Sequence, residues 1–585
     1  MLLSSSFLAH QRLLAELLAY AVCQIFPDVL FLGGETCRLG FFYRFVFSQK
    51  LPSDALSIIE TELKKNLKED CAIRFATMMR ENAQAYFLHH RQPFLAELAA
   101  TKEHNLVEIV QIGKFASLCP ELKELTSSLK ISPLVKLFEL QKEEIEVEGQ
   151  FYQTTIIKGN SFANKQELKQ FCKQYDRYKK KGNHLFLGSE LQLFEKVPVL
   201  SQLETCWLPK GEQIRHTLKK WVAPYWERSE VKQVTTPNFT LFNKKNSKTT
   251  ALFHAEGATY QPISSRLAAH SELIFLLQQN IGKQTLKVME YGPLFHSVKN
   301  KDLEGILWRQ VRYADQATLY CTKEEAIREI ISFLHFIEQI IKIFRFKAHW
   351  SFITSLEKKG ERQSENSAER IAVKLLREAV NKTESFIFQE EKREKCTELK
   401  EGPRLELTIT DRLNRSWPCS TFTVVAQKLR VIDFLNSPSE NREETEKRFF
   451  LKASIWGCLD RFIALLLEHD EGELPFWLAP EQVRILEIGE KAEQFAQFAY
   501  SFCQEKKLKV SRDCRSVALK EKLRDAHRSL IPVIVIIGEK EASKQMLTVQ
   551  TRQQPNKSQF LTLDQFLMLK ELEIDWPTLD KNLTY

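Results

Sequence analysis

Hydrophobic and polar positions follow three different patterns along the chain. In residues 1–195, helical stretches such as "ALSIIETELKKNLKED" are mixed with short strand patterns such as "LGFFYRFVFS". In residues 196–473, long amphipathic helices alternate with strands that no crossover helix follows, which favours a mixed or antiparallel sheet with helices packed against it. In residues 474–585, strands and helices alternate at short spacing. The pattern predicts three domains, of α+β and α/β class.

Composition narrows the class of protein. The 585 residues are 43% hydrophobic and 27% charged, the balance of a folded globular protein. No run of about 18 apolar residues exists to cross a bilayer. The twelve cysteines form no C-x-x-C pair, so reduced thiols and a cytoplasmic location are expected. The formal net charge of +9 is compatible with a polyanionic partner such as nucleic acid.

Ordered motifs then identify a family. They are "LLAYAVCQIFPD", "WLPKG", "VTTP", "YGPLFHSVKNKDLEGILWRQVRYADQATLYC", "GPRLELTITDRLNRSWPCST", "ASIWGCLDRFIALL" and "LPFWLAPEQVRILEIGEKA". In this order they resemble bacterial threonyl-tRNA synthetase, a class II aminoacyl-tRNA ligase, over nearly its whole length. The resemblance implies an editing-like domain with a helical linker at 1–195, an antiparallel-sheet class II catalytic domain at 196–473, and an α/β anticodon-binding domain at 474–585. The family's leading ubiquitin-like domain is expected to be missing.

The resemblance also implies a zinc site of one cysteine and two histidines. Those positions fall on Ser265, Thr318 and Lys452. Hydroxyl groups are poor zinc ligands and an ammonium group repels the cation, so no zinc is expected. His270, within "RLAAHSELIFLL", is interpreted as a packed or capping helix residue.

The motif 2 stretch departs from the family in its phosphate-binding residues. The family's arginine, which bridges the ATP α-phosphate and the amino-acid carboxylate, falls on Ser297, and its glutamate on Lys299. The arginine pair of the exit strand falls on Trp308 and Gln310. Arg312 lies two residues further, where strand alternation predicts the same face, so it is the candidate substitute.

Part of the ATP side is retained. Gly457 and Arg461 match motif 3, whose arginine the family places on the γ-phosphate, and Arg404 matches a basic position beside the site. The resemblance therefore implies Arg312, Arg404 and Arg461 as catalytic candidates, and Arg404, Arg461 and Gly457 as residues that bind ATP, the candidate cofactor. The alternative is that Arg404 and Arg461 are surface arginines on a sheet edge and a helix.

The family's editing histidines are also replaced. Its H-x-x-x-H pair falls on Arg12 and Glu16, a spacing that predicts a helical salt bridge. Cys119 matches an editing cysteine, but Lys123 stands where a histidine is expected. Editing is therefore expected to be absent.

The C-terminal region keeps more of the family pattern. Arg515, Lys522 and Arg552 match it, and the resemblance implies that they contact tRNA, with Arg552 reading an anticodon base. Arginine suits such a role because its planar fork bonds base edges and stacks on unpaired bases. A threonine-specific tRNA is the expected partner.

Three hypotheses follow. The first is a tRNA-binding, synthetase-like protein whose threonine activation and editing are impaired or lost. The second is a divergent ATP-dependent ligase that works without zinc. The third is a dimeric interaction protein, because motif 1 around Pro237 serves dimerisation in such folds, and a homodimer is expected.

Overall fold

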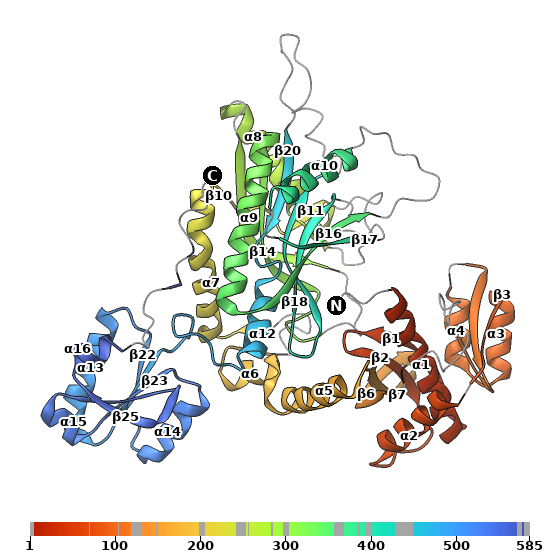
Figure 1. The fold of residues 1–585 in the computed structure, drawn as a ribbon, viewed down its shortest axis with the longest axis horizontal. Coiled ribbons are helices and arrows are strands. Elements are labelled where there is room, and N and C mark those ends of the chain that lie inside the picture. Colours follow the sequence, from red (N-terminus) through yellow and green to blue (C-terminus); the bar gives the residue numbers. More distant parts are fainter. Residues whose placement is uncertain are drawn as a thin grey trace, which may run out of the picture. The chain divides into compact units, whose positions relative to one another are not determined.

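The computed structural model describes residues 5–69, 71–102, 104–118, 132, 134–147, 150–197, 205–241, 253–255, 257–281, 285–296, 304–355, 368–383, 386–393, 401–426, 448–569, 576–577 and 579. The chain divides into two compact units (Figure 1). The first comprises residues 1–177 with 412–416, and the second comprises 178–411 with 417–585. None of the described helices combines the length and the apolar character that a bilayer span requires.

The first unit ends earlier than the expected boundary at residue 195. A π-helical turn, Tyr178–Gly182, and helix α6 (His184–Glu190) already belong to the second unit. The buried ring of His184 explains part of this, since its Nδ1 lies 2.7 Å from a carboxylate oxygen of Glu468. Residues 178–195 therefore fold with the domain that follows them.

The first unit holds a four-stranded antiparallel sheet, β1-β2-β7-β6, and a three-stranded sheet, β3-β4-β5. Its elements are α1 (Ser5–Ile25), β1 (Leu30–Cys37), β2 (Gly40–Val46), α2 (Ala55–Lys68), β3 (Ile73–Met79), α3 (Arg80–His89), α4 (Pro93–Ala100), β4 (Leu106–Ile112), β5 (Phe115–Leu118), β6 (Val135–Val147), β7 (Gln150–Ser161) and α5 (Lys165–Arg177). Helix α1 confirms the expected N-terminal helix. Four of its leucines are buried in the core that the strands of this unit share: Leu13, Leu14, Leu17 and Leu18.

The second unit contains an eight-stranded sheet in the order β10-β14-β15-β20-β19-β18-β16-β17. The pairs β14–β15, β15–β20 and β19–β20 are antiparallel, and the outer pairs β10–β14 and β16–β17 are parallel. The predicted mixed or antiparallel sheet is confirmed. Its elements and those beside it are β8 (Phe194–Glu195), β9 (Cys206–Trp207), α7 (Pro209–Arg228), β10 (Lys232–Gln233), β11 (Phe239–Leu241), β12 (Phe253–Ala255), β13 (Ala258–Pro262), α8 (Leu267–Ile281), β14 (Leu286–Phe295), β15 (Val311–Cys321), α9 (Lys323–Phe344), β16 (Lys347–Ser355), α10 (Ala368–Asn381), β17 (Phe388–Arg393), β18 (Arg404–Thr410), β19 (Ser416–Val424), β20 (Phe449–Ser454) and α12 (Leu459–His469).

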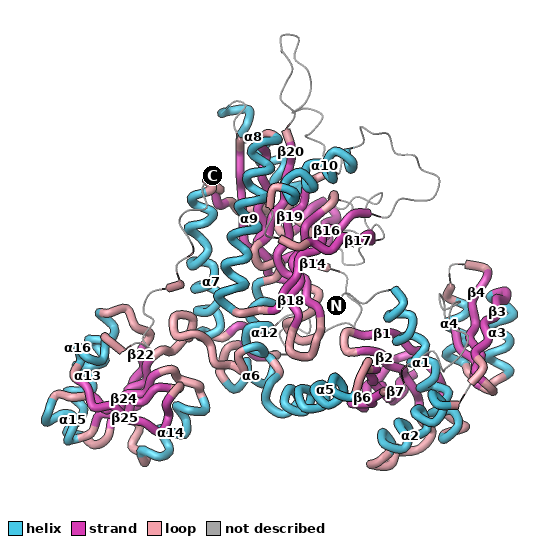
Figure 2. Tube along the Cα trace, viewed as in Figure 1, coloured by secondary structure: helices cyan, strands magenta, loops and turns pink. Residues whose placement is uncertain are grey.

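Long helices pack against this sheet, as the helical periodicity predicts (Figure 2). Helix α9 starts with a capping box, in which Thr322 and Glu325 exchange hydrogen bonds with each other's main-chain N–H groups. One stripe of α9 is buried, because its apolar residues recur at helical spacing. Phe336 of this stripe stacks on Tyr225 of α7, with ring centroids 3.9 Å apart.

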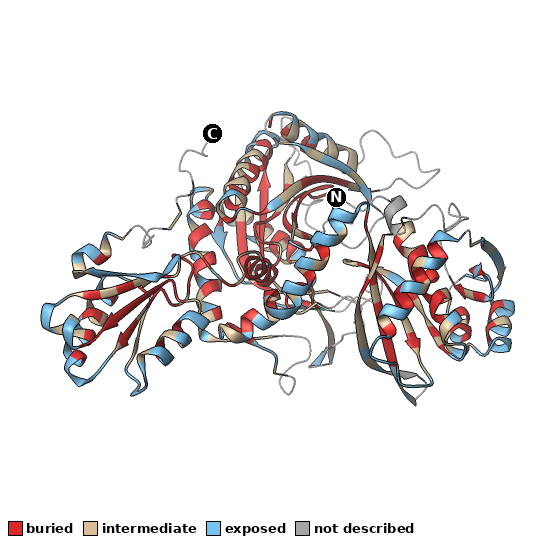
Figure 3. Cartoon of the chain, turned by 60° about the horizontal axis from the view of Figure 1, so that its bottom comes forward, coloured by how far each residue is buried: buried red, intermediate tan, exposed pale blue. Residues whose placement is uncertain are grey.

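The C-terminal part of the second unit has its own five-stranded sheet, β22-β21-β23-β24-β25, and its own apolar core. Its elements are β21 (Val483–Glu487), a 3-10 turn (Glu490–Ala492), α13 (Glu493–Glu505), β22 (Val510–Asp513), α14 (Leu519–Arg528), β23 (Val533–Ile537), α15 (Glu539–Lys544), β24 (Leu547–Thr551), β25 (Gln554–Leu561) and α16 (Leu563–Leu567). Figure 3 shows the buried inner strands and the exposed outer faces of the helices. The alternation of strand and helix predicted after residue 474 is present.

Candidate functional site

Arg461 is deeply embedded in the sheet domain. It lies in the first turn of α12, and its residue is 3% exposed. Its Nε donates to the main-chain carbonyl of Leu307 at 2.8 Å, and its Nη1 donates to that of Pro418 at 2.6 Å. The guanidinium group therefore ties together two segments that are far apart in the sequence.

Trp308 contacts two of the candidate arginines. The Cζ atoms of Arg312 and Arg461 lie 4.2 Å and 4.5 Å from its ring centroid. A guanidinium group over an aromatic ring is attracted to the negative face of the π-system. The structure thus brings Arg312 and Arg461 together, but it places an indole against both of them.

Arg312 does not share a strand face with Trp308 and Gln310. Strand β15 begins at Val311, and Trp308 instead closes a turn through a β-bridge with Glu304. The alternation argument is wrong at this point, because the two earlier residues precede the strand.

Arg404 forms a buried ion pair with Glu406, two residues along the same face of β18. The two residues are 6% and 4% exposed, and Nη2 lies 2.7 Å from Oε2. Strand β18 lies between β19 and β16 inside the sheet. The alternative of surface arginines is therefore wrong for both Arg404 and Arg461.

Gly457 has a local structural reason to be glycine. Its φ is +63°, and a Cβ atom there would lie 2.1 Å from the carbonyl oxygen of Cys419. Its N–H donates to Ser454 Oγ at 2.9 Å, which fixes the turn before α12. In that helix Asp460 is buried and pairs with Arg309 at 2.5 Å and with Arg215 at 3.2 Å.

These side chains do not fit an ATP triphosphate in the arrangement described. Phosphate oxygens need N–H donors that face an accessible space. The donors of Arg404 and Arg461 are buried, and the hydrogen bonds that they form go to groups of the protein itself.

Asp315 is a buried residue that sequence reasoning missed. Its carboxylate accepts hydrogen bonds from Ile455 N–H at 2.5 Å, Trp456 N–H at 3.0 Å and Ser454 Oγ at 2.9 Å. Burial raises the pKa of Asp315, and these donors oppose that shift. The signal in the sequence is that Asp315 is the one acidic residue of strand β15.

The three positions assigned to zinc carry donors that do not suit the metal. Thr318 and Lys452 face each other across the β15–β20 pair, and the ammonium group of Lys452 pairs with Glu401. Ser265 Oγ lies 3.4 Å from Gln316 Oε1. Neither hydroxyls nor a paired ammonium group match the thiolate, imidazole and carboxylate ligands of zinc. Within the described ranges, no cluster of three histidine, cysteine or acidic side chains is placed to hold a metal ion.

His270 is a packed residue of α8, which confirms its interpretation. The ring is fully buried, with Nδ1 3.0 Å from Thr318 Oγ1 and Nε2 3.3 Å from Glu290. Glu290 also pairs with Arg266 at 2.9 Å. Burial acts to raise the pKa of Glu290, but bonds from His270 and Thr236 together with the charge of Arg266 outweigh it and lower the pKa.

The predicted salt bridge at the editing positions is confirmed. Arg12 Nη1 lies 2.5 Å from Glu16 Oε1 on successive turns of α1. Glu16 is fully buried, and Arg12 also donates to the carbonyl of Leu118 at 3.3 Å. Four other positions discussed above lie outside the described residues: Cys119, Lys123, Ser297 and Lys299.

In the C-terminal domain, Lys522 is internal. It is 2% exposed, and its ammonium group donates to the carbonyls of Glu487 at 2.6 Å and Asp513 at 3.0 Å. The expected phosphate contact does not agree with this placement, because the charge already joins two strand ends. Arg515 is exposed at the surface, but its Nε and Nη2 donate hydrogen bonds to the carboxylate oxygens of Asp513 at 2.9 Å and 2.7 Å.

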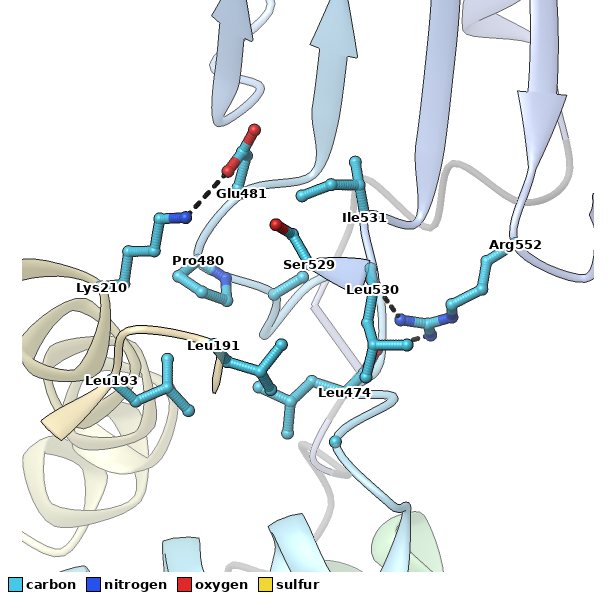
Figure 4. Close-up of a pocket in the computed structure, with 12 residues that line it drawn as sticks. Leu191, Leu193, Lys210, Leu474, Pro480, Glu481, Ser529, Leu530, Ile531 and Arg552 are labelled. Atoms are coloured by element: carbon cyan, nitrogen blue, oxygen red, sulfur yellow. Dashed lines mark hydrogen bonds and ion pairs between the residues drawn. The ribbon is translucent and has the colours of Figure 1, made fainter. Parts of the chain in front are cut away.

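Arg552 lies just after β24, beside a small cavity that Figure 4 shows. Its Nη1 donates to Leu530 O at 3.0 Å and its Nη2 to Leu474 O at 2.8 Å. Leu474 belongs to the connection from the sheet domain. The guanidinium group therefore holds this connection against the C-terminal domain, and contact with an RNA base stays a prediction.

Glu481 anchors the other side of this cavity (Figure 4). Its carboxylate pairs with Lys210 of α7 at 3.1 Å and with Arg484 at 2.6 Å, and it accepts a bond from Ser511 Oγ. Burial acts to raise the pKa of Glu481, but these partners outweigh it and lower the pKa to about 2.

Comparisons with known proteins show what the chain is similar to. The family model described as "Anticodon binding domain" matches residues 482–569. Threonine-tRNA ligases of Cytophaga hutchinsonii and Thermus thermophilus are each 26% identical to the chain. The matches cover 96% and 93% of this chain, and 87% and 85% of the relatives.

A solved structure supports the fold. The RNA-binding domain of threonyl-tRNA synthetase from Cryptosporidium parvum superposes with a TM-score of 0.59 at 23% identity, covering 68% of this chain and 99% of that one. The class II synthetase-like fold, with an antiparallel-sheet catalytic domain and a C-terminal anticodon-binding domain, is thereby confirmed. The chain is related to the threonyl-tRNA synthetase family over most of its length.

Proposed function

We propose that this relative of the threonyl-tRNA synthetases is a tRNA-binding protein in which threonine activation and editing are strongly reduced or lost. The observation that carries the proposal is the burial of Arg404 and Arg461, whose hydrogen bonds to Glu406, Leu307 and Pro418 turn most of their donors inward. A synthetase must place such charges where they meet the phosphates of its substrate, because charge stabilisation is the main catalytic term in phosphoryl chemistry.

The amino-acid side of the site supports the same proposal. Thr318 and Lys452 face each other where the resemblance expects metal ligands, and Lys452 is neutralised by Glu401. This leaves no soft ligand at either position to bind zinc and, through it, the amino group of threonine. We propose that the protein works without zinc.

Loss of editing is proposed on similar grounds. Arg12 and Glu16 hold each other in an ion pair, and the guanidinium group stays protonated at neutral pH. The family's hydrolysis uses imidazole groups as acid and base near pH 7, and neither Arg12 nor Glu16 supplies one.

The C-terminal domain is proposed to bind tRNA, most simply a threonine-specific one. It exposes several cations that can follow a phosphate backbone: Lys506, Lys507, Arg515, Lys520 and Arg524. Strand β25 is exposed along nearly its whole length and presents Phe560, an aromatic ring on which an unpaired base can stack. A cytoplasmic homodimer is part of the proposal by resemblance.

Two assays on the purified full-length chain test this proposal. We expect no threonine-dependent pyrophosphate exchange above background, and filter binding of tRNA that weakens as salt increases. Exchange at the rate of an ordinary synthetase would instead support the divergent ligase. Absence of tRNA binding at low salt, with a folded protein, would leave the dimeric interaction protein.

A further inference from the structure

We propose that Trp308 is an internal plug, whose indole packs against two guanidinium groups that a nucleotide triphosphate would need, those of Arg312 and Arg461. This inference rests on the proposed function and gives a physical cause for the lost activation. It concerns a contact within the chain, between a turn, strand β15 and helix α12.

Arg461 is held on several sides. Two of its N–H groups go to the carbonyls of Leu307 and Pro418, and the indole of Trp308 lies against its guanidinium group. Its Nη2 is buried and has no acceptor within the described part of the chain. That donor is unsatisfied in the fold, so it is the one for which a phosphate oxygen would be a partner.

The turn that carries Trp308 is fixed in place. Trp308 closes a turn, since Glu304 N–H donates to the Trp308 carbonyl at 2.9 Å. Within the turn, Gly305 has φ +56°, and a Cβ atom there would lie 2.2 Å from His184 Nε2. The tight fit at this glycine leaves the turn little room to shift.

His184 fastens the same turn to the core. Its Nε2 accepts a bond from Ile306 N–H at 3.2 Å, so its Nδ1 carries the proton and donates to Glu468 at 2.7 Å. Both His184 and Glu468 are buried. The indole is therefore presented by a rigid turn that is anchored on α6 and α12.

The other two candidate cations, Arg312 and Arg404, offer no replacement site for a phosphate. Arg312 contacts the same indole, and Arg404 is committed to Glu406 inside the sheet. A triphosphate would have to displace an indole from two guanidinium groups before it met an accessible donor. Binding that depends on a rarely populated open state is weakened in proportion to that population.

The experiment is isothermal titration of Mg-ATP into the full-length protein and four variants. Trp308→Ala and Trp308→Leu remove the aromatic face, and Trp308→Phe retains it. Trp308→Ala combined with Arg461→Met tests whether any gain depends on the arginine. Inorganic tripolyphosphate and adenosine are titrated in parallel, to distinguish a phosphate site from an adenine site.

We expect no saturation of the wild type or of Trp308→Phe at millimolar ATP. We expect Trp308→Ala or Trp308→Leu to bind ATP and tripolyphosphate about tenfold more tightly or better, and adenosine no better. The double variant should lose that gain. Circular dichroism selects the variants that are folded, and the leucine variant serves if the alanine variant is not.

Two results would overturn the plug. One is micromolar ATP binding by the wild type, and the other is a folded alanine or leucine variant that gains no affinity. These outcomes are separable from the proposed function. A wild type without pyrophosphate exchange whose open variants still fail to bind ATP would refute the plug alone, whereas exchange by the wild type would refute the proposed function.

Discussion

The sheet domain and the C-terminal domain both contain the basic residues that the sequence singles out, but they use them differently. In the sheet domain, Arg404 and Arg461 are buried and bond to a carboxylate and to main-chain carbonyls. In the C-terminal domain, Arg515 and Lys520 are exposed. A buried cation shapes and stabilises the fold, and only an exposed one can meet an external polyanion.

The same contrast occurs within a single helix of the C-terminal domain. Lys520 and Lys522 are two residues apart on α14, yet the first faces solvent and the second is buried with two carbonyl partners. A basic residue that matches a family pattern is therefore a candidate ligand contact only when its side chain is exposed.

The largest effect is expected from Arg461→Ala. The change removes the N–H groups that donate to the carbonyls of Leu307 and Pro418, and it removes the cation that packs on Trp308. We therefore expect the sheet domain to lose about 3–5 kcal/mol of stability. Thermal melting and hydrogen exchange of α12 measure this. Arg524→Ala, which changes an exposed arginine, is the matched control. An unchanged melting curve for Arg461→Ala would mean that the residue is not a structural clamp.

The next effect is expected from Glu481→Gln, which tests the joint between the two domains. The pKa of about 2 lies below the ordinary value of 4.5, so the charged form stabilises the fold by about 3 kcal/mol at neutral pH. Since the folded pKa is depressed, this contribution is present above pH 4.5 and is lost as the pH falls toward 2. The melting temperatures of wild type and variant should therefore differ at pH 7 and converge as the solution becomes acidic. Glu505→Gln, an exposed change on α13, should show no such convergence.

The two lysines of α14 give a paired prediction. Lys522→Met should lower the stability of the C-terminal domain by about 1–3 kcal/mol, because two carbonyls lose their donor, and it should leave the salt dependence of tRNA binding unchanged. Lys520→Met should do the reverse, with normal stability and a slope of log affinity against log salt that is smaller by about 1. Equal effects of the two changes would contradict the contrast between buried and exposed cations.

The fold followed from the sequence to a large extent, because hydrophobic periodicity is a local signal. Helix α1, the antiparallel core of the large sheet and the alternating C-terminal domain all match their patterns. The Arg12–Glu16 bridge could also be predicted, since i and i+4 spacing places two side chains side by side on a helix.

The candidate site could be predicted only in part, because its decisive contacts join distant segments. Nothing in the sequence around Trp308 indicates that Arg461 packs against it, or that His184 fixes the turn before it. The sequence pattern also did not show that β15 starts only at Val311. Trp308 was therefore assigned wrongly to a strand face. Asp315 could be seen as the one acidic residue of β15, but the N–H groups from which it accepts hydrogen bonds could not.

The smallest effect is expected from Arg552→Ala, compared with Arg515→Ala. Arg552 donates two hydrogen bonds to carbonyls where the C-terminal domain meets its connection. Its loss should lower stability by about 1–2 kcal/mol and should weaken the binding of every tRNA to a similar, small degree. Arg515 is exposed and pairs with Asp513 and Asp525, and an exposed ion pair contributes little, so its loss should change the melting temperature only slightly and reduce the salt slope of tRNA binding. Melting curves and filter binding with threonine tRNA and an unrelated tRNA measure both changes. If Arg552→Ala instead removed the preference for threonine tRNA at constant stability, the guanidinium group would have to leave Leu474 and Leu530 on binding and read a base, as the family pattern implies.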